Sequence, residues 1–408
     1  MIKPKLKDPP KMRVAWICHF SNHEVQSILH PNFYEGEFAP WITNLAKLFE
    51  NDSEIELHIL SPDNQLSGYK HFTLNNIHYH FFNPHVILFG KSLGKFHMNY
   101  RTNFIYLKFV IGRIINHIKP DIIHLHGAEV DHSSSIFQFR NKYPILITIQ
   151  GFASHATRRD NYFIKYRINI EKKIFRRFYH FGYRTQTMGR DIKKYSPQSV
   201  LHWHHYPIPP IKIERVEKEF DLVFFARVTK DKGIEDLLEC LSLIKKTIPE
   251  ISLCIIGGTN NTYLQHLAKI ANNLNISNNI KWIGFVQNHL EMFKIAESAR
   301  ISVLPTHHDI ISGTIIESMF LKLPVVAYNV GSIHEINETG EFVHLIEKGD
   351  IMAMANKIIS LLNNPQKLSE IGEMAYNRVL EMFDNKQIHS DVTNAYKQVI
   401  EDYITSKK

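Results

Sequence analysis

The stretch from Ile301 to Ala327 constrains the fold of this chain more than any other part of the sequence. A short apolar run, Ile301 to Leu304, predicts a buried strand. After a polar loop, apolar residues recur at helical spacing just beyond Gly313, which predicts a helix over Thr314 to Leu321. A second apolar run, Leu323 to Ala327, follows directly. The stretch therefore predicts a strand, a loop, a helix and a strand in succession, which is the repeating unit of parallel α/β sheets.

The start of this predicted helix is also a candidate binding site. A helix that begins just after Gly313 directs free backbone N–H groups at the preceding loop, where they can bind a phosphate. Glu317 lies about one turn further along, so its carboxylate can reach hydroxyl groups of the same ligand, as acidic residues do for ribose in dinucleotide-binding folds. The alternative is an ordinary βαβ unit with a solvated glutamate, and this stretch alone does not separate the two.

Length and pattern predict two domains. A chain of 408 residues is too long for one hydrophobic core. The segment Tyr206 to Pro210 is a stiff, proline-rich break, and apolar runs alternate with amphipathic segments on both sides of it. The predicted fold class is therefore α/β, with two doubly wound domains that each contain a parallel sheet. We expect a first domain over 1–206, a linker over 207–213, a second domain over 214–385, and a helix over 386–408 that can pack on either half.

The individual elements follow from hydrophobic periodicity. The further expected strands are Val14–Cys18, Ile55–Leu60, Ile77–Phe82, Pro120–Leu125, Ile145–Ile149, Phe220–Ala226, Ser252–Ile256 and Ile280–Ile283. The further expected helices are Phe38–Phe49, Phe104–Ile118, Gly233–Thr247, Tyr263–Asn273, His289–Ala299, Asp350–Leu362, Gln366–Phe383 and Lys386–Tyr403.

Charge and cysteine usage limit the classes of partner. The net charge of +8 favours anionic partners such as nucleotide phosphates, nucleic acid or an acidic membrane surface. The three cysteines lie inside apolar runs at no metal-ligand spacing, which indicates core residues in a reducing compartment. No segment has the pattern of a signal peptide or a membrane span. We expect a cytoplasmic protein, either soluble or peripheral on the inner face of a membrane.

Two segments are strongly basic and rich in aromatic residues, Val86 to Ile118 and Arg158 to Arg190. The first of them could contact an anionic membrane surface or an anionic acceptor. A solvated basic face over a core-packing stripe is the favoured alternative for the first of them. Neither segment contains a nucleic-acid-binding module, so we expect no nucleic-acid partner.

Polar residues follow two predicted strands of the first half. His124, His126 and Glu129 lie at the end of one strand, and Gln150 and His155 follow the next. Ligands of open α/β sheets bind at the carboxyl ends of the strands, so these five residues are candidates for one crevice. Any single histidine among the 25 in the chain is more often structural than catalytic.

Five segments of the second half resemble the retaining glycosyltransferases of the GT-B fold, family 4. In order, they are FFARVTKDKGIEDLLE (Phe224–Glu239), LCIIGG (Leu253–Gly258), IKWIGFV (Ile280–Val286), the Ile301–Ala327 stretch, and NVGSIHEINETGEFV (Asn329–Val343). In the first half the resemblance is confined to the loop after the first strand, to PDIIHLHG (Pro120–Gly127) and to ITIQG (Ile147–Gly151). The resemblance implies two Rossmann-like domains facing each other across a cleft, with a nucleotide-sugar donor held mainly by the second.

Two cations are implied at the donor diphosphate. The family's arginine after the first strand of this domain corresponds to Arg227, and its lysine before a glycine corresponds to Lys232. Two positive charges there would stabilise the charge that develops on a leaving diphosphate. Without the flanking motif, both residues would be read as surface charge.

The family's pair of acidic residues corresponds to Asp309 and Glu317. Glu317 is implied at the ribose hydroxyls, and Asp309 stands where the family usually has a glutamate that contacts the transferred sugar. Gly313, Thr314 and Ile315 lie between them and would offer backbone N–H groups to the phosphates.

The resemblance also implies the rest of the donor pocket. Val286 corresponds to the position where backbone groups meet the nucleobase, and Gly258 closes the preceding motif of the donor site. The donor is expected to be a UDP- or GDP-sugar. The chain has no acidic cluster of the DxD type, so no metal and no other cofactor is expected.

The first half departs from the family pattern at two places. The glycine pair that usually follows the first strand is missing after Cys18, and the nearest candidate is Gly36. The family's histidine at the end of the TxH strand is replaced by Gln150. An amide can hydrogen-bond a sugar hydroxyl but cannot act as a base. Either a donor phosphate serves as base, or His126 or His155 takes that role.

The expected function is transfer of a sugar from a nucleoside-diphosphate sugar to an acceptor hydroxyl, with retention at the anomeric carbon. Arg227, Lys232, Asp309 and Gln150 are the residues expected at the reacting groups. The acceptor is expected to be a saccharide or a lipid-linked glycan in surface polysaccharide synthesis. The alternatives are a nucleotide-sugar 2-epimerase of the same fold and an inactive relative that only binds a nucleotide sugar.

Overall fold

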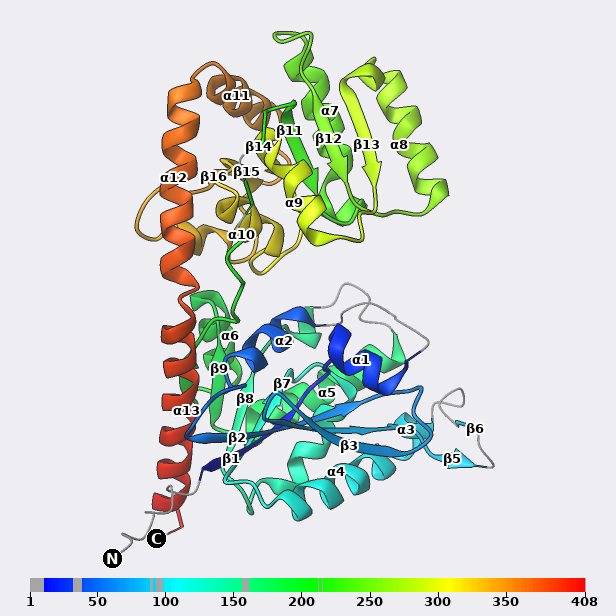
Figure 1. Cartoon of the computed structure of the whole chain (residues 1–408), viewed down its shortest axis with the longest axis vertical. Helices are drawn as coiled ribbons and strands as arrows, with labels where there is room; N and C mark the ends of the chain where they lie inside the picture. The colour runs from blue at the N-terminus through cyan, green and yellow to red at the C-terminus, as the bar shows by residue number, and fades with distance from the viewer. Residues whose placement is uncertain are drawn as a thin grey trace, which may run out of the picture. The chain divides into compact units, whose positions relative to one another are not determined.

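The computed structural model describes residues 11–31, 39–88, 91–92, 98–155, 161–211, 213–214 and 216–407 (Figure 1). The chain divides into two compact units. The first unit combines Met1–Ile208 with Phe383–Lys408, and the second unit is Pro209–Met382. Some sequence features fall outside the described residues, namely Gly36, positions 89–90 and 93–97 of the first basic segment, and positions 156–160.

The first unit contains an eight-stranded sheet in the order β10-β9-β8-β7-β1-β2-β4-β3. Its strands are β1 Met12–Ile17, β2 Ile55–Pro62, β3 Tyr69–Leu74, β4 Ile77–Phe82, β7 Ile122–His126, β8 Ile145–Thr148, β9 His180–Tyr183 and β10 Val200–Trp203. All neighbours are parallel except β3 and β4, which form an antiparallel pair at the edge. Two short strands, β5 Ile87–Leu88 and β6 Lys91–Ser92, form a separate antiparallel pair.

The middle of this sheet is buried on both faces. Every residue of β7 and of β8 is buried, as their continuous apolar sequences predict for central parallel strands. The helices of this unit are α1 His23–Leu29, α2 Pro40–Lys47, α3 Met98–Arg101, α4 Ile105–Ile118, α5 Tyr162–Arg177, α6 Gln186–Tyr195 and α13 Asn385–Thr405, with 3₁₀ turns over Asp131–Phe139 and Ala153–His155.

The last helix, α13, belongs to the core of the first unit (red in Figure 1). It packs against β7, β8 and β10. Its buried Tyr396 hydroxyl accepts a 2.8 Å hydrogen bond from the Trp16 indole N–H and lies 2.8 Å from His124 Nδ1. His124 Nε2 in turn lies 2.7 Å from Thr148 Oγ1. His124 is therefore a buried structural residue, fully hydrogen-bonded between a strand and the last helix.

The second unit contains a six-stranded parallel sheet in the order β13-β12-β11-β14-β15-β16. The strands are β11 Phe220–Phe225, β12 Leu253–Ile256, β13 Ile280–Gly284, β14 Ala299–Leu304, β15 Val325–Tyr328 and β16 His344–Ile346. The helices are α7 Ile234–Lys245, α8 Asn261–Asn273, α9 His289–Glu297, α10 Gly313–Phe320, α11 Ile351–Leu362 and α12 Pro365–Met382, with 3₁₀ turns over Lys230–Lys232, Ser277–Asn279 and Ile333–Asn337.

The predicted α/β class and most predicted elements are confirmed to within a few residues, and two predictions are wrong in detail. The first sheet is not wholly parallel, because β3 pairs with β4 in the antiparallel sense. The helix predicted to end at Ala299 ends at Glu297, because Ala299 already pairs with Phe220 as the first residue of β14.

Candidate functional site

Hydrogen bonds to neighbouring segments hold the loop between β14 and α10 in place in the second unit. Its His307 N–H donates to the Asp231 carbonyl at 2.8 Å, and His307 Nε2 lies 3.1 Å from a carboxylate oxygen of Asp236. The Ser332 N–H donates to the Ile310 carbonyl at 2.9 Å. Contacts to the loops after β11 and β15 therefore fix the position of the polar residues in between.

Two glycines make this arrangement possible. Gly233 has a φ of +76°, and a Cβ atom there would lie 1.8 Å from the Pro305 carbonyl oxygen. Gly331 has a φ of +58°, and its Cβ would lie 1.7 Å from the Asp309 carbonyl oxygen. Each position requires both a left-handed backbone and the absence of a side chain. The close approach of these backbones brings the loops after β11, β14 and β15 together.

Lys232 and Asp309 form an ion pair in this loop cluster. The Lys232 Nζ lies 2.5 Å from Asp309 Oδ2, and both side chains are only 19% exposed. The shorter acid at 309 thus reaches the lysine that precedes Gly233. Arg227, two residues past the end of β11, is exposed, and its side chain forms no hydrogen bond or ion pair with the described residues. The structure brings Lys232 and Asp309 together and leaves the Arg227 guanidinium in solvent.

Helix α10 begins at Gly313, one residue before the predicted start at Thr314, and its N-terminus is open. The Ser312 side chain makes no capping hydrogen bond, and Gly313 is exposed. The Thr314 hydroxyl donates to the Phe225 carbonyl at 3.0 Å, which anchors the first turn to the end of β11. The Ile315 N–H already donates to Ser312 at 3.1 Å. Within this turn the amides of Gly313 and Thr314 are therefore the ones available to bind an anion.

Glu317 lies one turn into α10, and the surrounding protein strongly affects its ionisation. Burial raises the pKa of this carboxyl to about 7, because no cation compensates for the water that it has lost. No hydrogen bond to its side chain occurs among the described residues. A partly buried, unpartnered carboxyl beside an open helix N-terminus is a suitable acceptor for ligand hydroxyl groups.

The turns after β12 and β13 lie at the carboxyl ends of their strands, as do the loops after β11 and β14 in the same sheet. The Gly257 N–H donates to Gly284 at 2.8 Å, and the Val228 N–H donates to Gly258 at 3.1 Å. Phe285, between Gly284 and Val286, is 78% exposed, whereas Val286 packs partly against the core. Gly258 and Val286 therefore lie on linked turns at the carboxyl ends of neighbouring strands.

The first unit has a polar cluster at the carboxyl ends of β7 and β8. The Gln150 amide donates to the Tyr206 hydroxyl at 3.2 Å, and His126 Nδ1 lies 3.2 Å from that same hydroxyl. An Arg184 N–H donates to the Gln150 carbonyl at 3.2 Å. Of the five predicted crevice residues, the structure brings Gln150, His126 and Glu129 together, whereas His124 is in the core and His155 is exposed against Phe152.

Several buried polar atoms of this cluster have no hydrogen-bond partner in the part of the chain that the structure describes. They are Nε2 of His126, Oε2 of Glu129, and both ring nitrogens of His132. A Cβ atom on Gly127 would lie 3.2 Å from the Glu129 Oε1 and 3.3 Å from the side-chain amide oxygen Oε1 of Gln150. Burial raises the pKa of Glu129 to about 7. Orphaned buried polar atoms in one place are typical of a ligand site, since proteins otherwise pair such atoms.

Sequence reasoning did not find Tyr206, Arg184 or His132. Tyr206 was assigned to the proline-rich break, yet it is buried and hydrogen-bonds two crevice residues. The feature that could have identified Tyr206 is its position shortly after β10, the last strand before the break. Arg184 likewise follows β9 directly. Because β9 and β10 were not predicted, the residues at their ends were not recognised.

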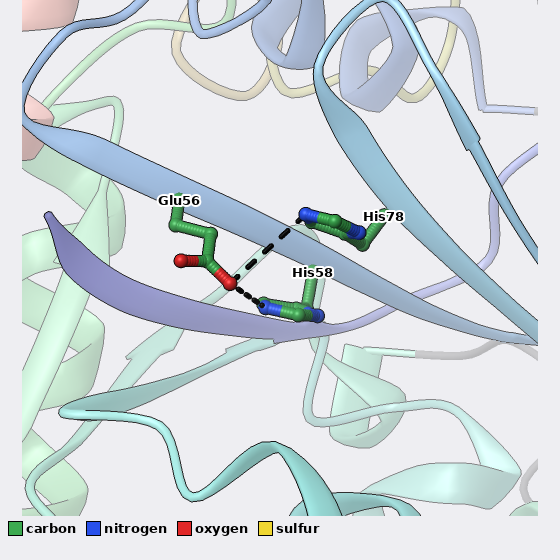
Figure 2. A group of neighbouring side chains, drawn as sticks. All are labelled: Glu56, His58 and His78. Carbon is green, nitrogen blue, oxygen red and sulfur yellow. Dashed lines mark hydrogen bonds and ion pairs between the residues drawn. The ribbon is translucent and has the colours of Figure 1, made fainter.

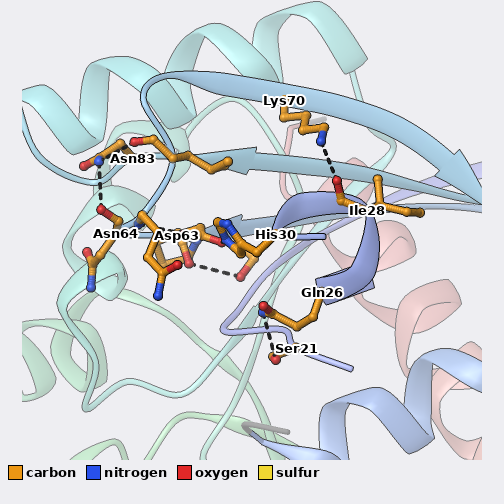
Figure 3. Close-up of polar contacts among 12 residues, drawn as sticks. Ser21, Gln26, Ile28, His30, Asp63, Asn64, Lys70 and Asn83 are labelled. Atoms are coloured by element: carbon orange, nitrogen blue, oxygen red, sulfur yellow. Dashed lines mark hydrogen bonds and ion pairs between the residues drawn. The ribbon is translucent and has the colours of Figure 1, made fainter. Parts of the chain in front are cut away.

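The loop after β1 lacks the expected glycines and is built by side chains instead (Figure 3). Asn22 caps α1 by accepting from the Val25 N–H at 2.8 Å. The Gln26 amide donates to the Ser21 hydroxyl at 3.1 Å, and His30 lies 2.8 Å from Asp63 at the end of β2. Side-chain hydrogen bonds therefore hold the residues between β1 and the end of α1.

Residues 210–378 match the family model of glycosyl transferases group 1. The chain is 26% identical over 185 residues to the capsular polysaccharide biosynthesis glycosyltransferase CapM of Staphylococcus aureus. This alignment covers 45% of this chain and 47% of that protein. The chain thus spans about half the length of the curated relatives it matches.

Solved structures match nearly the whole chain. Sucrose-phosphate synthase from Thermosynechococcus elongatus aligns with a TM-score of 0.72 at 14% identity, over 96% of this chain and 100% of the other. HepE of Anabaena in complex with UDP aligns with a TM-score of 0.70 at 14% identity, over 95% and 100%. These likenesses confirm the predicted fold, a two-domain α/β architecture of the GT-B type. No helix in the described part of the chain has the length and apolar character to cross a membrane.

Proposed function

We propose that this chain, which has the GT-B fold and matches the group 1 glycosyl transferases over residues 210–378, transfers a sugar from a nucleoside-diphosphate sugar to an acceptor hydroxyl. The observation that carries the proposal is the arrangement around α10. The Lys232–Asp309 ion pair lies in the loop cluster that leads into α10 of the second unit, and the uncapped start at Gly313 and the partly buried Glu317 belong to α10 itself. Together they offer a cation, free amides and a hydroxyl acceptor, which are the groups that a nucleoside diphosphate needs.

In this proposal Lys232 changes partner when the donor binds. Its ammonium group leaves Asp309 for the diphosphate, and Asp309 is released to accept hydrogen bonds from hydroxyls of the transferred sugar. Arg227 and the amides of Gly313 and Thr314 complete the positive surroundings of the phosphates. As the bond to the anomeric carbon breaks, these preorganised charges stabilise the leaving diphosphate. Retention of configuration and the absence of a protein nucleophile remain part of the proposal.

The acceptor is proposed to bind at the polar cluster of the first unit. Gln150, Tyr206 and Glu129 offer donors and acceptors suited to sugar hydroxyls. Burial raises the pKa of Glu129 to about 7, so this carboxyl can take up a proton near neutral pH, as an alternative to the donor phosphate. Burial lowers the pKa of His126 well below its ordinary value, which makes His126 the weaker candidate for this role. A saccharide or lipid-linked glycan fits this chemistry, and the likeness to a capsular polysaccharide enzyme supports it.

The donor is proposed to be a UDP-sugar, with a GDP-sugar as the alternative. A structural neighbour is known in complex with UDP, which supports the first. Contact with an anionic membrane surface is a further part of the proposal. Helix α4 supports it, because Ile105 and Phe109 are 69% and 60% exposed beside the basic residues of that segment.

A thermal-shift screen against UDP-, GDP- and ADP-sugars tests the donor class. A ligand that binds only the folded state raises the melting temperature, so one nucleotide series should stabilise the protein and the others should not. Incubation of the same sugars with saccharide acceptors should then release free nucleotide only when an acceptor is present. Nucleotide release or epimer formation without acceptor would contradict a transferase, and binding without any turnover would indicate an inactive relative.

The pKa of Glu317 predicts how donor affinity depends on pH. In the free protein this carboxyl titrates near pH 7, and ribose hydroxyls that donate to it favour its ionised form. Affinity for the sugar nucleotide should therefore rise with pH and level off above 7. Between pH 6 and pH 8 we expect about a tenfold gain, because one pKa unit corresponds to a factor of ten.

Calorimetric titration with UDP-glucose from pH 5.5 to 8.5 measures this dependence, since a diphosphodiester has no phosphate that titrates in that range. Glu317→Gln should flatten the profile. Glu129→Gln is the matched control, because it removes a carboxyl of similar pKa from the other unit and should leave the slope intact. If Glu129→Gln flattens the profile instead, the donor is assigned to the wrong unit.

A further inference from the structure

Three side chains with metal-ligand chemistry converge on one face of the first sheet (Figure 2). Glu56 and His58 are two residues apart on β2, so they point to the same face. His78 on β4 lies directly opposite His58 in the parallel register. The Glu56 Oε1 lies 3.0 Å from His58 Nε2 and 4.0 Å from His78 Nε2. Strand geometry, and not a flexible loop, therefore places the three candidate ligand atoms.

The other nitrogen of each imidazole has its own partner. His58 Nδ1 lies 3.1 Å from His80 Nε2, and His78 Nδ1 lies 3.0 Å from the Thr73 hydroxyl. His80 Nδ1 lies in turn 2.7 Å from the Tyr69 hydroxyl. These contacts orient both rings with Nε2 towards Glu56, as Figure 2 shows. Metal-binding histidines characteristically use their second nitrogen in this way.

We propose that Glu56, His58 and His78 bind one divalent transition-metal ion, with Zn²⁺ as the best fit. Two imidazole nitrogens and one carboxylate oxygen suit zinc, whereas Ca²⁺ and Mg²⁺ prefer oxygen ligands throughout. Ligand atoms about 2.0–2.1 Å from a tetrahedral ion lie about 3.3 Å apart, and the observed separations bracket this value. The side chains of Glu56 and His78 are 37% and 30% exposed, so water can reach a fourth position.

An ion pair between Glu56 and His58 explains only part of this arrangement. It does not account for His78, whose ring stacks on that of His58 with centroids 4.6 Å apart and whose Nε2 is directed at the same carboxylate oxygen. A bound cation would balance the carboxylate and fix both rings. It would also join β2 to β4 and, through Thr73 and Tyr69, to the antiparallel edge strand β3. The proposed role of the ion is therefore to stabilise this part of the first sheet.

Zinc binding to the full chain tests the proposal. After treatment with a chelator, the protein is titrated with Zn²⁺ in competition with a chromophoric chelator, and its melting temperature is followed in parallel. We expect one equivalent of tight binding and a higher melting temperature with metal. Substitution by Co²⁺ should give the visible absorption of a tetrahedral ion with nitrogen and oxygen ligands.

Glu56→Gln and His78→Gln should each lower the affinity of the proposed site for Zn²⁺. The loss of an outer-shell partner costs roughly 10–100-fold in metal affinity, and we expect a larger loss here because a direct ligand is removed. Both side chains are partly exposed, so these variants should fold, as circular dichroism would verify. His71→Gln is the matched control. His71 stacks on His80 with centroids 4.5 Å apart on the same patch, yet it supplies none of the three ligands.

Because the chain has 25 histidines, weak additional binding is expected in every variant. The proposal is overturned if the wild-type protein binds no equivalent more tightly than His78→Gln does. It is also overturned if His71→Gln loses the tight equivalent as completely as the two ligand variants. Neither result would affect the proposed sugar transfer, which depends on residues of the second unit and on the polar cluster at the carboxyl ends of β7 and β8 in the first unit.

Discussion

Replacing Lys232 by alanine should lower kcat/KM for sugar transfer by about 10²–10³-fold while the protein remains folded. In the proposed mechanism this ammonium group stabilises the charge that develops on the leaving diphosphate. Removal of one preorganised group of this kind from an active site costs about 2.7–4 kcal/mol in the transition state. The measurement is initial rates of nucleotide release with saturating acceptor, at several donor concentrations.

Lys230→Ala is the matched control for this variant. Lys230 has the same charge and lies two residues away in the same turn, but its side chain is 75% exposed and its contact is a 3.5 Å pair with Glu235. Its loss should change the rate by less than about twofold, as exposed ion pairs contribute little. Equal losses in both variants would show that general positive charge, and not the position of Lys232, supports the reaction.

The ion pair itself offers a second test of the same residue. Lys232→Ala also leaves Asp309 without its cation, which could damage the site indirectly. The double variant with Asp309→Asn removes that unpaired charge. If Lys232 acts on the diphosphate, the double variant should be no more active than Lys232→Ala. Recovery of the rate in the double variant would mean that Lys232 serves only to neutralise Asp309.

A large loss of stability is expected for Gly233→Ala. A methyl group at this position would lie 1.8 Å from the Pro305 carbonyl oxygen, so the backbone after β14 or the start of α7 must move. The left-handed backbone adds about 1–2 kcal/mol, and overpacking adds about 1–3 kcal/mol. The total of about 2–5 kcal/mol should lower the melting temperature of the second unit by roughly 4–20 °C. Differential scanning calorimetry measures this shift without assuming that both units unfold together.

Gly349→Ala separates the two causes. Gly349 also has a positive φ, +85°, but nothing lies within 4 Å of its Cβ position. This variant should therefore lose only the backbone contribution of about 1–2 kcal/mol. If both alanine variants melt at the same temperature, the close approach of Gly233 to Pro305 contributes nothing measurable. Stabilisation of Gly233→Ala by a sugar nucleotide should be weaker than that of the wild-type protein, because Lys232 directly precedes the displaced residue.

The sequence predicts the central strands well and the edge strands poorly, for a physical reason. Strands such as β7 and β14 are buried on both faces, and their continuous apolar runs are visible without any partner. Strand β3 alternates between exposed and half-buried residues, which is a weak signal beside polar turns. The histidines that form the proposed metal site lie on β2 and β4, and only the register of those two strands brings them together.

The donor-side residues were identified by motif, but their contacts could not be predicted. Lys232 and Asp309 are 77 positions apart, and no spacing rule links them. Their contact depends on Gly233 and Gly331, where a side chain would collide with backbone. The raised pKa of Glu317 likewise results from burial, a property of the assembled fold and not of the local sequence.

The hydrogen bond between Trp16 and Tyr396 sets a minimum time before the first unit can complete its folding during synthesis. Its two partners are 380 positions apart, and everything in the second unit is translated between them. At roughly 5–20 residues per second, a ribosome needs roughly 20–80 seconds to cover that distance. The second unit is continuous in sequence and can fold during this interval. The first unit must wait with part of its sheet uncovered until α13 emerges, so the first-made half of the chain is the last to be completed.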